Sequence, residues 1–308
     1  MNKLRKILSI NGGGIRGIIP CVVLSFIEEI TQKPIYELFD IIGGCSTGGI
    51  IALGLTVKNN KYKASDLQRL YDDYGKIIFS SSIIRNILNP GTLDKSKYDN
   101  KNLKKVLIKF FEKNLLQDTI TKVVINSYDF ERNIPVYFKS YDKQVEYKLV
   151  DVALATSAAP TFFPPVRINN KNDYFGCIDG GIYCNNPSLL LYSEAKKLWP
   201  NDDFLLVSLG TGELTRRHLY NDVKNWGLLS WGKELFNMSI NGTSKMVNDV
   251  LKNILPHDKF YSYEIRLDIG SDDMDDASFD NRRKLQLLGE EITRRDYNKL
   301  KNMCNLLK

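Results

Sequence analysis

The chain has 308 residues, of which 43% are hydrophobic and 26% are charged. This composition is typical of a globular α/β protein and excludes a disordered, collagen-like or disulfide-rich chain. The net charge of +7 fits contact with phospholipid headgroups or phosphates, and the scattered lysines with no nucleic-acid-binding signature lead us to expect no nucleic-acid partner.

The cysteines and the first residues of the chain indicate in which cellular compartment the protein is expected. The five cysteines stand at unpatterned spacings, so we expect free thiols in a reducing compartment and no metal site. The apolar run at residues 7–10 is too short for an export signal, and no run approaches the roughly 18 apolar residues that span a bilayer. We therefore expect a cytoplasmic protein that is soluble or peripherally bound to a membrane.

The first predicted strand, residues 6–10, leads into a glycine loop at residues 11–17, Asn-Gly-Gly-Gly-Ile-Arg-Gly, and a helix follows at residues 18–30. This order of strand, glycine loop and helix presents backbone N–H groups to an anion without obstruction by side chains. The loop is therefore a candidate anion site.

Two enzymatic hypotheses fit this loop. A dinucleotide site would need an acidic residue after the second strand, about 20 residues on, but the available carboxylates precede the second apolar run. The other hypothesis is an oxyanion hole in the loop Gly12, Gly13 and Gly14, with the amides of the last two as donors. Arg16 would then lie at the rim, where it orients the loop or attracts a phosphate.

The central prediction concerns residues 40–53. A short apolar run enters a turn of small residues and a second apolar run leaves it, which predicts a strand, a tight turn and a helix with Ser46 at the apex. Gly44 and Gly48 flank Ser46 in the Gly-x-Ser-x-Gly pattern of a nucleophile elbow. Glycine is needed there because the apex backbone is strained and a β-carbon would collide with the turn. The nearby helix N-terminus favours the negative charge that develops on attack.

The segments after the elbow predict helices and the walls of a pocket. Residues 64–76 and 100–113 have helical patterns, the second with a lysine-rich outer face. Residues 77–91 are apolar and interrupted by serines, so they form either a lid over the site or a segment packed on the core. Phe162 and Phe163 belong to a rigid aromatic and proline-rich stretch suited to an apolar wall.

A second candidate catalytic residue follows a predicted strand at residues 174–178. Asp179 is followed by Gly180 and Gly181, an arrangement that can hold a carboxylate against a closely packed neighbour. Taken alone, an Asp-Gly-Gly tripeptide more commonly marks a turn whose aspartate has no catalytic role.

The C-terminal part is predicted to be mostly helical. Residues 226–254 form a helix with a break at residues 241–242, and Trp231, Leu235 and Met238 share a face that we expect in the core. A strand, an acidic loop without the spacing of a calcium site and a last helix at residues 281–307 follow. We expect a single domain over residues 1–308, with the helices from about residue 226 packed on it.

Three segments in this order resemble the patatin-like phospholipases: the glycine loop with its arginine, the elbow around Ser46 and the Asp-Gly-Gly that starts at Asp179. The Asn-Asn-Pro turn and the stretches near residues 209–212 and 274–290 also look like this family. One departure is Asn11, where the family commonly has an aspartate. The resemblance implies an α/β fold, a three-layer α/β/α sandwich with a mainly parallel central sheet and the elbow between a strand and a helix.

The resemblance also implies a serine lipid acyl hydrolase of the phospholipase A type, which needs no cofactor and acts at the inner face of the membrane. Ser46 would be the nucleophile and Asp179 the base of a dyad, with an acyl-serine intermediate. A triad completed by His218 or His257 also matches the hydrolase chain order, although each histidine is more simply a surface residue.

Two sets of side chains are expected around this dyad. An apolar environment would raise the pKa of Asp179 and so make it a stronger base; its candidates are Phe162, Phe163, Ile83 and Ile84. Basic side chains would meet the phospholipid headgroup; the candidates are Arg16, Lys104 and Lys105.

The glycine loop, the Ile-Arg-Gly-Ile-Ile-Pro that follows its start and the Trp-Gly pairs near residue 230 also resemble compact bacterial phospholipases that cyclic nucleotides switch on in antiviral defence. On this hypothesis a basic cleft binds the phosphates of a cyclic oligonucleotide. The alternatives are a constitutive lipid acyl hydrolase or esterase and a catalytically dead lipid-binding module. The oligomeric state does not follow from the sequence.

Overall fold

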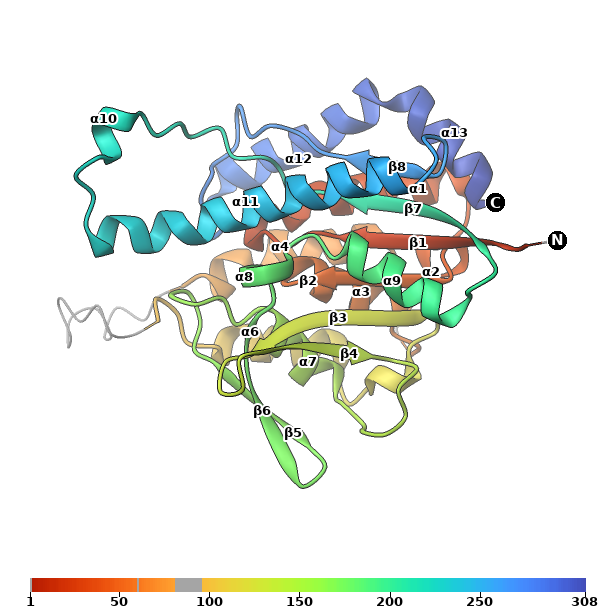
Figure 1. Ribbon diagram of the computed structural model, residues 1–308, viewed down its shortest axis with the longest axis horizontal. Helices are drawn as coiled ribbons and strands as arrows, with labels where there is room; N and C mark the ends of the chain where they lie inside the picture. Colours follow the sequence, from red (N-terminus) through yellow and green to blue (C-terminus); the bar gives the residue numbers. More distant parts are fainter. Residues whose placement is uncertain (1, 60, 81–95) are drawn as a thin grey trace.

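The computed structural model describes residues 2–59, 61–80 and 96–308 (Figure 1). Its strands are β1 (Leu4–Ile10), β2 (Ile41–Cys45), β3 (Lys122–Asp129), β4 (Ile134–Lys139), β5 (Val166–Asn170), β6 (Asp173–Asp179), β7 (Asp203–Leu209) and β8 (Phe260–Tyr263). These strands form one eight-stranded sheet in the order β5-β6-β3-β2-β1-β7-β8, with β4 also paired to β3. The run from β3 to β8 is parallel throughout, and the pairings of β4, β5 and β6 are antiparallel.

The helices fall before, between and after these strands. Those of the first half are α1 (Ile18–Thr31), α2 (Ile35–Leu38), α3 (Thr47–Thr56), α4 (Ala64–Ile78), α6 (Lys101–Phe111) and α7 (Leu149–Thr156), with short 3-10 turns at Gly14–Gly17 and Leu116–Asp118. Those of the second half are α8 (Gly181–Cys184), α9 (Ser188–Leu198), α10 (Tyr220–Val223), α11 (Leu228–Ile254), α12 (Phe279–Arg295) and α13 (Tyr297–Leu307).

Helices cover both faces of the sheet. Successive side chains of a strand point to opposite faces of the sheet. The side chains of the central strands accordingly belong to two separate hydrophobic cores, with Leu8 and Ile42 in the larger core and Ile7 and Ile41 in the smaller. The larger core is closed by α1, α3, α4, α6, α7, α12 and α13, and the smaller by α9 and α11 (Figure 1). The predicted three-layer α/β/α sandwich with a mainly parallel sheet is thus confirmed.

The strand register brings the three predicted chemical segments to one edge of the sheet. Ile10 of β1 pairs with Gly44 of β2, so the glycine loop and Ser46 leave neighbouring parallel strands side by side. Cys45 at the end of β2 pairs with Asn126 of β3, and Asp179 pairs antiparallel with the next residue, Ser127. Ligand sites of open α/β sheets lie at this carboxyl edge of the parallel strands.

Three predictions about individual elements are wrong. Helix α11 is unbroken at residues 241–242, because one mid-helix glycine costs only about 1 kcal/mol and the helix packs on α8 and α9. Leu235 and Met238 are exposed instead of core residues. The last predicted helix is two helices, α12 and α13, which meet at Asp296.

Two further observations concern membranes and the expected lid. Along the described part of the chain, no helix combines the length and the hydropathy needed to cross a bilayer. The lid is expected at residues 77–91, and its part from residue 81 on, which includes Ile83 and Ile84, lies outside the described residues. The lid and the roles of these two isoleucines therefore stay predictions.

Candidate active site

Ser46 occupies the junction between β2 and α3, as the elbow pattern predicts. Its backbone has φ 53° and ψ −123°, a left-handed conformation that costs a residue other than glycine about 1–3 kcal/mol. The Ser46 amide donates a hydrogen bond to Thr156 Oγ1 at 2.9 Å, and Thr156 Oγ1 donates to the Asn126 carbonyl at 2.7 Å. The strained apex is therefore tied to α7 and β3, and the serine lies at the N-terminus of α3.

The two elbow glycines are required by close backbone contacts. A β-carbon on Gly44 would lie 2.2 Å from the carbonyl carbon and oxygen of Gly48, and one on Gly48 would lie 2.2 Å from the Ile10 carbonyl oxygen. Such distances are far inside van der Waals contact, so neither position admits a side chain. The Gly-x-Ser-x-Gly spacing is thus explained by the turn itself.

Asp179 ends β6, which β3 separates from β2 in the sheet, and its side chain reaches Ser46 across the end of β3. Its carboxyl group interacts with the Ser46 side chain, which lowers the pKa of the carboxyl group, and its Oδ1 accepts the Gly181 amide at 2.8 Å and the Cys45 thiol at 3.5 Å. The residue is only 2% exposed. The structure therefore brings together the two side chains predicted as a dyad.

Burial sets the acidity of this carboxyl group. Desolvation raises the pKa of Asp179 from 3.8 to about 6, and the hydrogen bonds from Ser46, Gly181 and Cys45 oppose the rise. Burial also raises the pKa of the Cys45 thiol well above its usual value, so the thiol stays protonated and remains a donor. Asp179 is therefore a stronger base than a solvated aspartate and is still ionised at neutral pH.

The glycine loop packs directly beside the serine. A β-carbon on Gly12 would lie 3.2 Å from Ser46 Cβ. The Gly12 amide donates to the Asn185 carbonyl at 3.1 Å, so Gly12 belongs to the loop without offering a donor to an oxyanion. The amides of Gly13 and Gly14 remain, since neither donates to another group within the described part of the chain and both residues line the pocket that holds Ser46.

Contacts from distant elements hold this loop in place. Thr211 Oγ1 and Asn185 Nδ2 donate to the Gly12 carbonyl at 2.6 and 3.3 Å. The Ile15 amide donates to the Met274 carbonyl at 2.8 Å. Gly14 has φ 59°, and a β-carbon there would lie 2.2 Å from the same Met274 oxygen. The free amides are thus preorganised by the segments that follow β7 and α8 and by the loop before α12.

Arg16 lies under the glycine loop and not at its rim, which corrects the sequence-based expectation. It is only 1% exposed, its Nε donates to the Gly13 carbonyl at 3.2 Å, and burial lowers its pKa to about 10. The predicted role in orienting the loop fits this geometry. Contact with a phospholipid headgroup does not, because solvent cannot reach the side chain.

An apolar pocket surrounds the candidate dyad and the free amides. Phe162 and Phe163 line it, as expected. The other apolar lining residues come from α3, α4, α6, α11 and the loops that follow α4 and precede α12: Ile50, Leu70, Tyr71, Ile78, Phe79, Leu103, Phe236, Ile240 and Met274. A pocket with one polar end and long apolar walls suits an acyl chain whose ester group lies at Ser46.

The remaining candidates lie away from the pocket lining. His218 contacts Glu234 through Nε2 at 3.2 Å, and His257 is exposed; neither lines the pocket with Ser46. Lys104 and Lys105 are exposed on α6 outside that lining, so their contact with a headgroup stays a prediction. All five cysteines are free thiols, as expected.

The dinucleotide hypothesis is not supported. The glycine loop packs against Ser46 and Asn185, where a dinucleotide would require an open crevice, and β2 ends in Gly44 and Cys45 without the acidic residue that binds a ribose. The close packing of loop and serine instead matches an oxyanion hole.

Sequence reasoning missed the residues that support the site. Thr156, Thr211 and Met274 act through hydrogen bonds to the backbone of residues far away in the chain, and no local pattern marks such partners. Asn185 had a signal, because it begins the Asn-Asn-Pro turn that resembles the family, but its bonds to Gly12 require the fold.

Comparisons with known proteins agree with this geometry. The family described as patatin-like phospholipase matches residues 8–192. Patatin-like protein 1 of Arabidopsis thaliana is 30% identical over 337 residues, covering 93% of this chain and 80% of that protein. Probable inactive patatin-3-Kuras 1 of Solanum tuberosum is 31% identical over 335 residues, covering 96% and 88%.

Among solved structures, VipD from Legionella pneumophila matches with a TM-score of 0.44 and 14% identity, over 94% of this chain and 67% of that chain. Nothing about function follows from a likeness at this level. The name of the potato relative suggests a loss of activity in that protein, so the site residues have to be tested directly.

Proposed function

Because this chain belongs to the patatin-like phospholipase family, whose members are lipid acyl hydrolases, we propose that it cleaves the acyl esters of membrane phospholipids with Ser46 as nucleophile and Asp179 as general base. The family places the chain among the carboxylic ester hydrolases. The observation that carries the proposal is that Ser46 and Asp179, whose side chains interact, line one apolar pocket together with Gly13 and Gly14.

The first half of the reaction forms an acyl-serine. Asp179 takes the hydroxyl proton as Ser46 Oγ attacks the ester carbonyl carbon. The carbonyl oxygen becomes an oxyanion and accepts hydrogen bonds from the Gly13 and Gly14 amides, and each such donor typically contributes about 2.7–4 kcal/mol to the stability of the transition state. The carbon–oxygen bond to the lysophospholipid then breaks, and the leaving oxygen takes the proton from Asp179.

The second half releases the fatty acid. Asp179 takes a proton from a water molecule, whose oxygen attacks the acyl carbonyl, and the same two amides stabilise the second oxyanion. Ser46 Oγ leaves with that proton, which restores the starting state. One aspartate serves both steps because it receives a proton before each bond breaks and returns it afterwards.

The pKa of about 6 suits Asp179 to this role. A base with a pKa of 3.8 would take a proton from a serine hydroxyl less readily, whereas a carboxyl group with a pKa well above 7 would already be protonated. The apolar walls that take the acyl chain are also the surroundings that raise this pKa, so substrate contact and basicity have the same structural origin.

The experiment is fatty-acid release from phospholipid vesicles and from a soluble short-chain ester. Ser46→Ala and Asp179→Asn should each lose at least about a thousandfold in kcat on both substrates. Ser157→Ala is the matched control, because this serine lines the same pocket but donates to the Ala153 carbonyl; it should keep its activity. Hydrolysis by Ser46→Ala at the wild-type rate would overturn the proposal.

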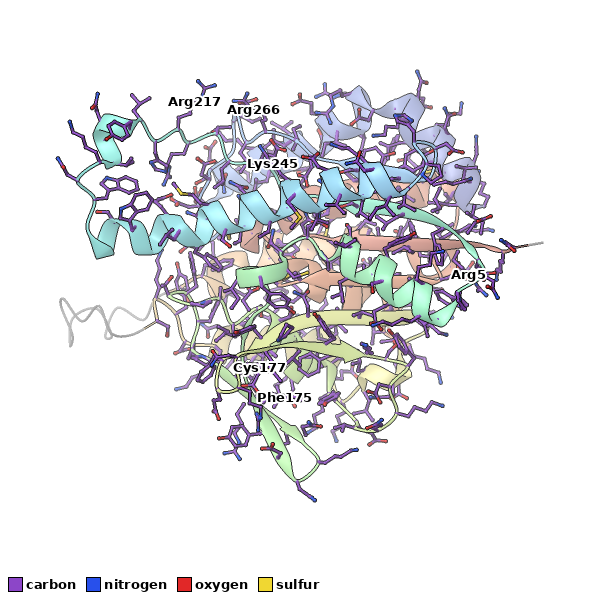
Figure 2. The ribbon with its side chains drawn as sticks, in the orientation of Figure 1. Arg5, Phe175, Cys177, Arg217, Lys245 and Arg266 are labelled. Carbon is purple, nitrogen blue, oxygen red and sulfur yellow. The ribbon has the colours of Figure 1, made fainter. Side chains whose placement is uncertain are left out.

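A second candidate function is control of this hydrolase by a cyclic oligonucleotide, as in antiviral defence. The observation that favours it is a pair of cations, Lys245 on α11 and Arg266 on the loop after β8, which are labelled in Figure 2. Glu213 links the two, since its carboxylate pairs with Lys245 at 3.3 Å and its backbone bridges to Arg266. Phosphates of a nucleotide would find positive charge there.

The test adds a panel of cyclic di- and trinucleotides to the vesicle assay. Release only in the presence of one nucleotide, lost in Lys245→Gln/Arg266→Gln, would support the switch. Release that needs Ser46 but no nucleotide would identify a constitutive acyl hydrolase and overturn the switch.

A further inference from the structure

One surface of the molecule is apolar, exposed and not used by the chemistry described so far. It belongs to residues 217–238, here called the tip, which comprise α10 and the first part of α11. Large apolar side chains stand in water on it: Leu219 is 65% exposed, Tyr220 78%, Leu235 56% and Met238 39%. Soluble proteins seldom expose so many large apolar side chains in one short segment, and such groups mark contacts with membranes or other proteins.

The tip projects from the body at the edge of the sheet where the candidate active site lies. Figure 1 shows α10 and the start of α11 extending past the carboxyl ends of the parallel strands. Leu235 and Met238 point outward, whereas Phe236 and Ile240 of the same helix line the pocket that holds Ser46. One helix therefore carries both the exposed apolar side chains and part of the pocket wall.

A hollow connects the two sides of this helix. It is lined by Leu235 from the tip, Ile182 from α8, and Phe162, Phe236 and Met274, and these last three also line the pocket that holds Ser46. Asn237, Asp272 and Asp273 also line the hollow, so its apolar side is the one that joins the tip to the pocket wall.

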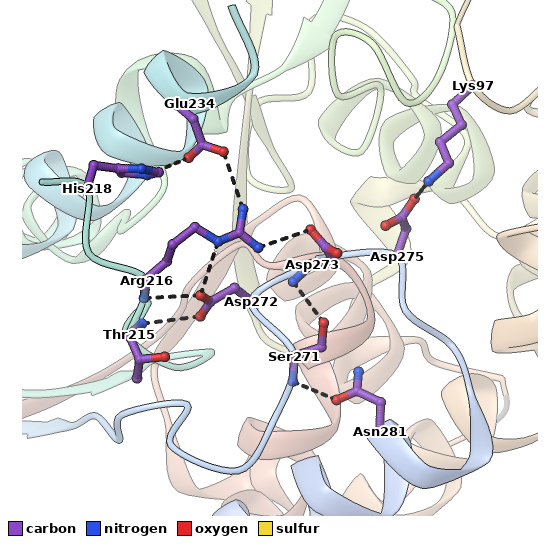
Figure 3. A network of polar contacts seen from close by, with 10 residues as sticks. All are labelled: Lys97, Thr215, Arg216, His218, Glu234, Ser271, Asp272, Asp273, Asp275 and Asn281. Atoms are coloured by element: carbon purple, nitrogen blue, oxygen red, sulfur yellow. Dashed lines mark hydrogen bonds and ion pairs between the residues drawn. The ribbon is translucent and has the colours of Figure 1, made fainter. Parts of the chain in front are cut away.

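The base of the tip is fixed by polar contacts. Arg216 Nη1 contacts Glu234 Oε1 at 3.3 Å, the Arg216 amide donates to Asp272 Oδ2 at 3.1 Å, and His218 Nε2 contacts Glu234 Oε2 at 3.2 Å (Figure 3). Trp226 stacks edge-on against both His218 and Trp231. The acidic side chain of Glu234 is turned inward, so the tip is held as a formed surface.

The charge of the tip decides between two binding partners, a second copy of the chain and an anionic lipid surface. Residues 217–238 contain three basic and two acidic residues; one of the acidic residues, Glu234, is buried, whereas Arg217 and Lys224 are exposed. A symmetric dimer is the commonest oligomer and would set this net positive surface against itself, whereas an anionic lipid surface would attract it at about 1 kcal/mol per basic residue near the membrane. Tyrosine and tryptophan are also the side chains that favour the boundary between headgroups and acyl chains.

We propose that the tip, through Leu219, Tyr220 and Leu235 with Arg217 and Lys224, docks the protein on a bilayer that contains anionic phospholipids and so holds the pocket mouth against its substrate. This inference rests on the proposed function, because it names the membrane surface on which that site works.

The test separates docking from catalysis. Binding is measured by sedimentation with vesicles of phosphatidylcholine, with and without phosphatidylglycerol, in a Ser46→Ala background so that the lipid stays intact. The variant is Leu219→Ser/Tyr220→Ser, which changes two exposed residues that line neither the pocket nor the hollow. The matched control is Ile120→Ser/Ile254→Ser, which changes two exposed isoleucines that precede β3 and β8 and so lie at the opposite edge of the sheet.

We expect the tip variant to lose at least about tenfold in the bound fraction on phosphatidylglycerol vesicles, because it removes apolar area that enters the interface. The control should bind like the parent, and both should bind phosphatidylcholine alone only weakly. With Ser46 present, the tip variant should hydrolyse a soluble ester at the wild-type rate and vesicles at least about tenfold more slowly.

Three results would overturn the proposal. They are equal vesicle binding by the tip variant and its parent, binding that does not depend on phosphatidylglycerol, and a dimer in light scattering that the tip variant converts to a monomer. Hydrolysis by the Ser46→Ala protein would instead refute the proposed function. The sedimentation assay would still test membrane docking by the tip.

Discussion

Replacing Asp179 by asparagine is expected to stabilise the fold while it abolishes hydrolysis. Burial raises the pKa of this carboxyl group from 3.8 to about 6, and each pKa unit corresponds to about 1.36 kcal/mol. Ionised Asp179 therefore costs the folded state about 3 kcal/mol at pH 7. A neutral amide avoids this cost and still accepts the Gly181 amide hydrogen bond, but it takes no proton from Ser46.

The sign of this effect depends on pH. Between pH 3.8 and about 6 the folded state binds more protons at Asp179 than the unfolded state does, so stability falls as the pH rises through this window. The stabilisation by Asp179→Asn is therefore about 3 kcal/mol at pH 7 and about half of that at pH 5. An unfolding entropy of about 2.1 cal/mol/K per residue converts 3 kcal/mol into a rise of about 4–5 °C in Tm for a chain of 308 residues.

The assay is thermal unfolding by circular dichroism at pH 5 and pH 7, together with hydrolysis of a soluble ester. Asp129→Asn is the control, since this buried carboxylate accepts Arg132 Nη1 at 2.6 Å and its neutral form should lower Tm. The reasoning is refuted if Asp179→Asn lowers Tm at pH 7, if its gain is larger at pH 5, or if it retains wild-type hydrolysis.

Three other outcomes follow from the same geometry. Because Asp179 must be ionised to act, kcat/KM for a soluble ester should fall about tenfold per pH unit below about pH 6, and a profile that stays level down to pH 4 would contradict the base assignment. Gly44→Ala should destabilise the fold by at least about 3 kcal/mol because its β-carbon meets backbone at 2.2 Å, whereas Gly242→Ala, whose β-carbon meets nothing, should be neutral or stabilising in the same melts. His218→Ala and His257→Ala should keep soluble-ester activity within about twofold; loss of activity in either would restore the triad.

The elbow was predictable because its causes are local. A strained residue at the apex and two backbone contacts inside van der Waals distance require Gly44, Ser46 and Gly48 at fixed spacing, and that requirement is written in five consecutive residues. The pairing of Ser46 with Asp179, 133 positions later, has no such local signal. It came from the resemblance to a family, and the pairing of β6 with β3 now gives its structural reason.

The environment of the glycine loop could not be predicted. Whether the Gly12 amide is free depends on Asn185, and whether Arg16 reaches solvent depends on the strands and loops that close over it. Asn185 lies 173 positions after Gly12 in the chain, and the turn that carries Arg16 contacts α3, α4 and α12, so both are decided by elements outside the loop. The sequence pattern identifies the loop as an anion site and leaves open which of its amides remain free.

The exposed face of α11 shows a second limit. Trp231, Leu235 and Met238 share a helical face, and an apolar face predicts a core contact. Phe236 and Ile240 form another apolar face of the same helix, and that one lines the pocket. When a helix is apolar on two sides, periodicity does not determine which side is buried.

The measurement that tests the central claim most directly is intact-mass analysis after reaction with a long-chain fluorophosphonate. This reagent phosphonylates an activated serine and mimics the tetrahedral intermediate. We predict a single adduct per chain, located on Ser46 by peptide mapping, absent in Ser46→Ala and formed at least about a hundredfold more slowly in Asp179→Asn. An adduct on another residue, or labelling of Asp179→Asn at the wild-type rate, would contradict a nucleophile at Ser46 activated by Asp179.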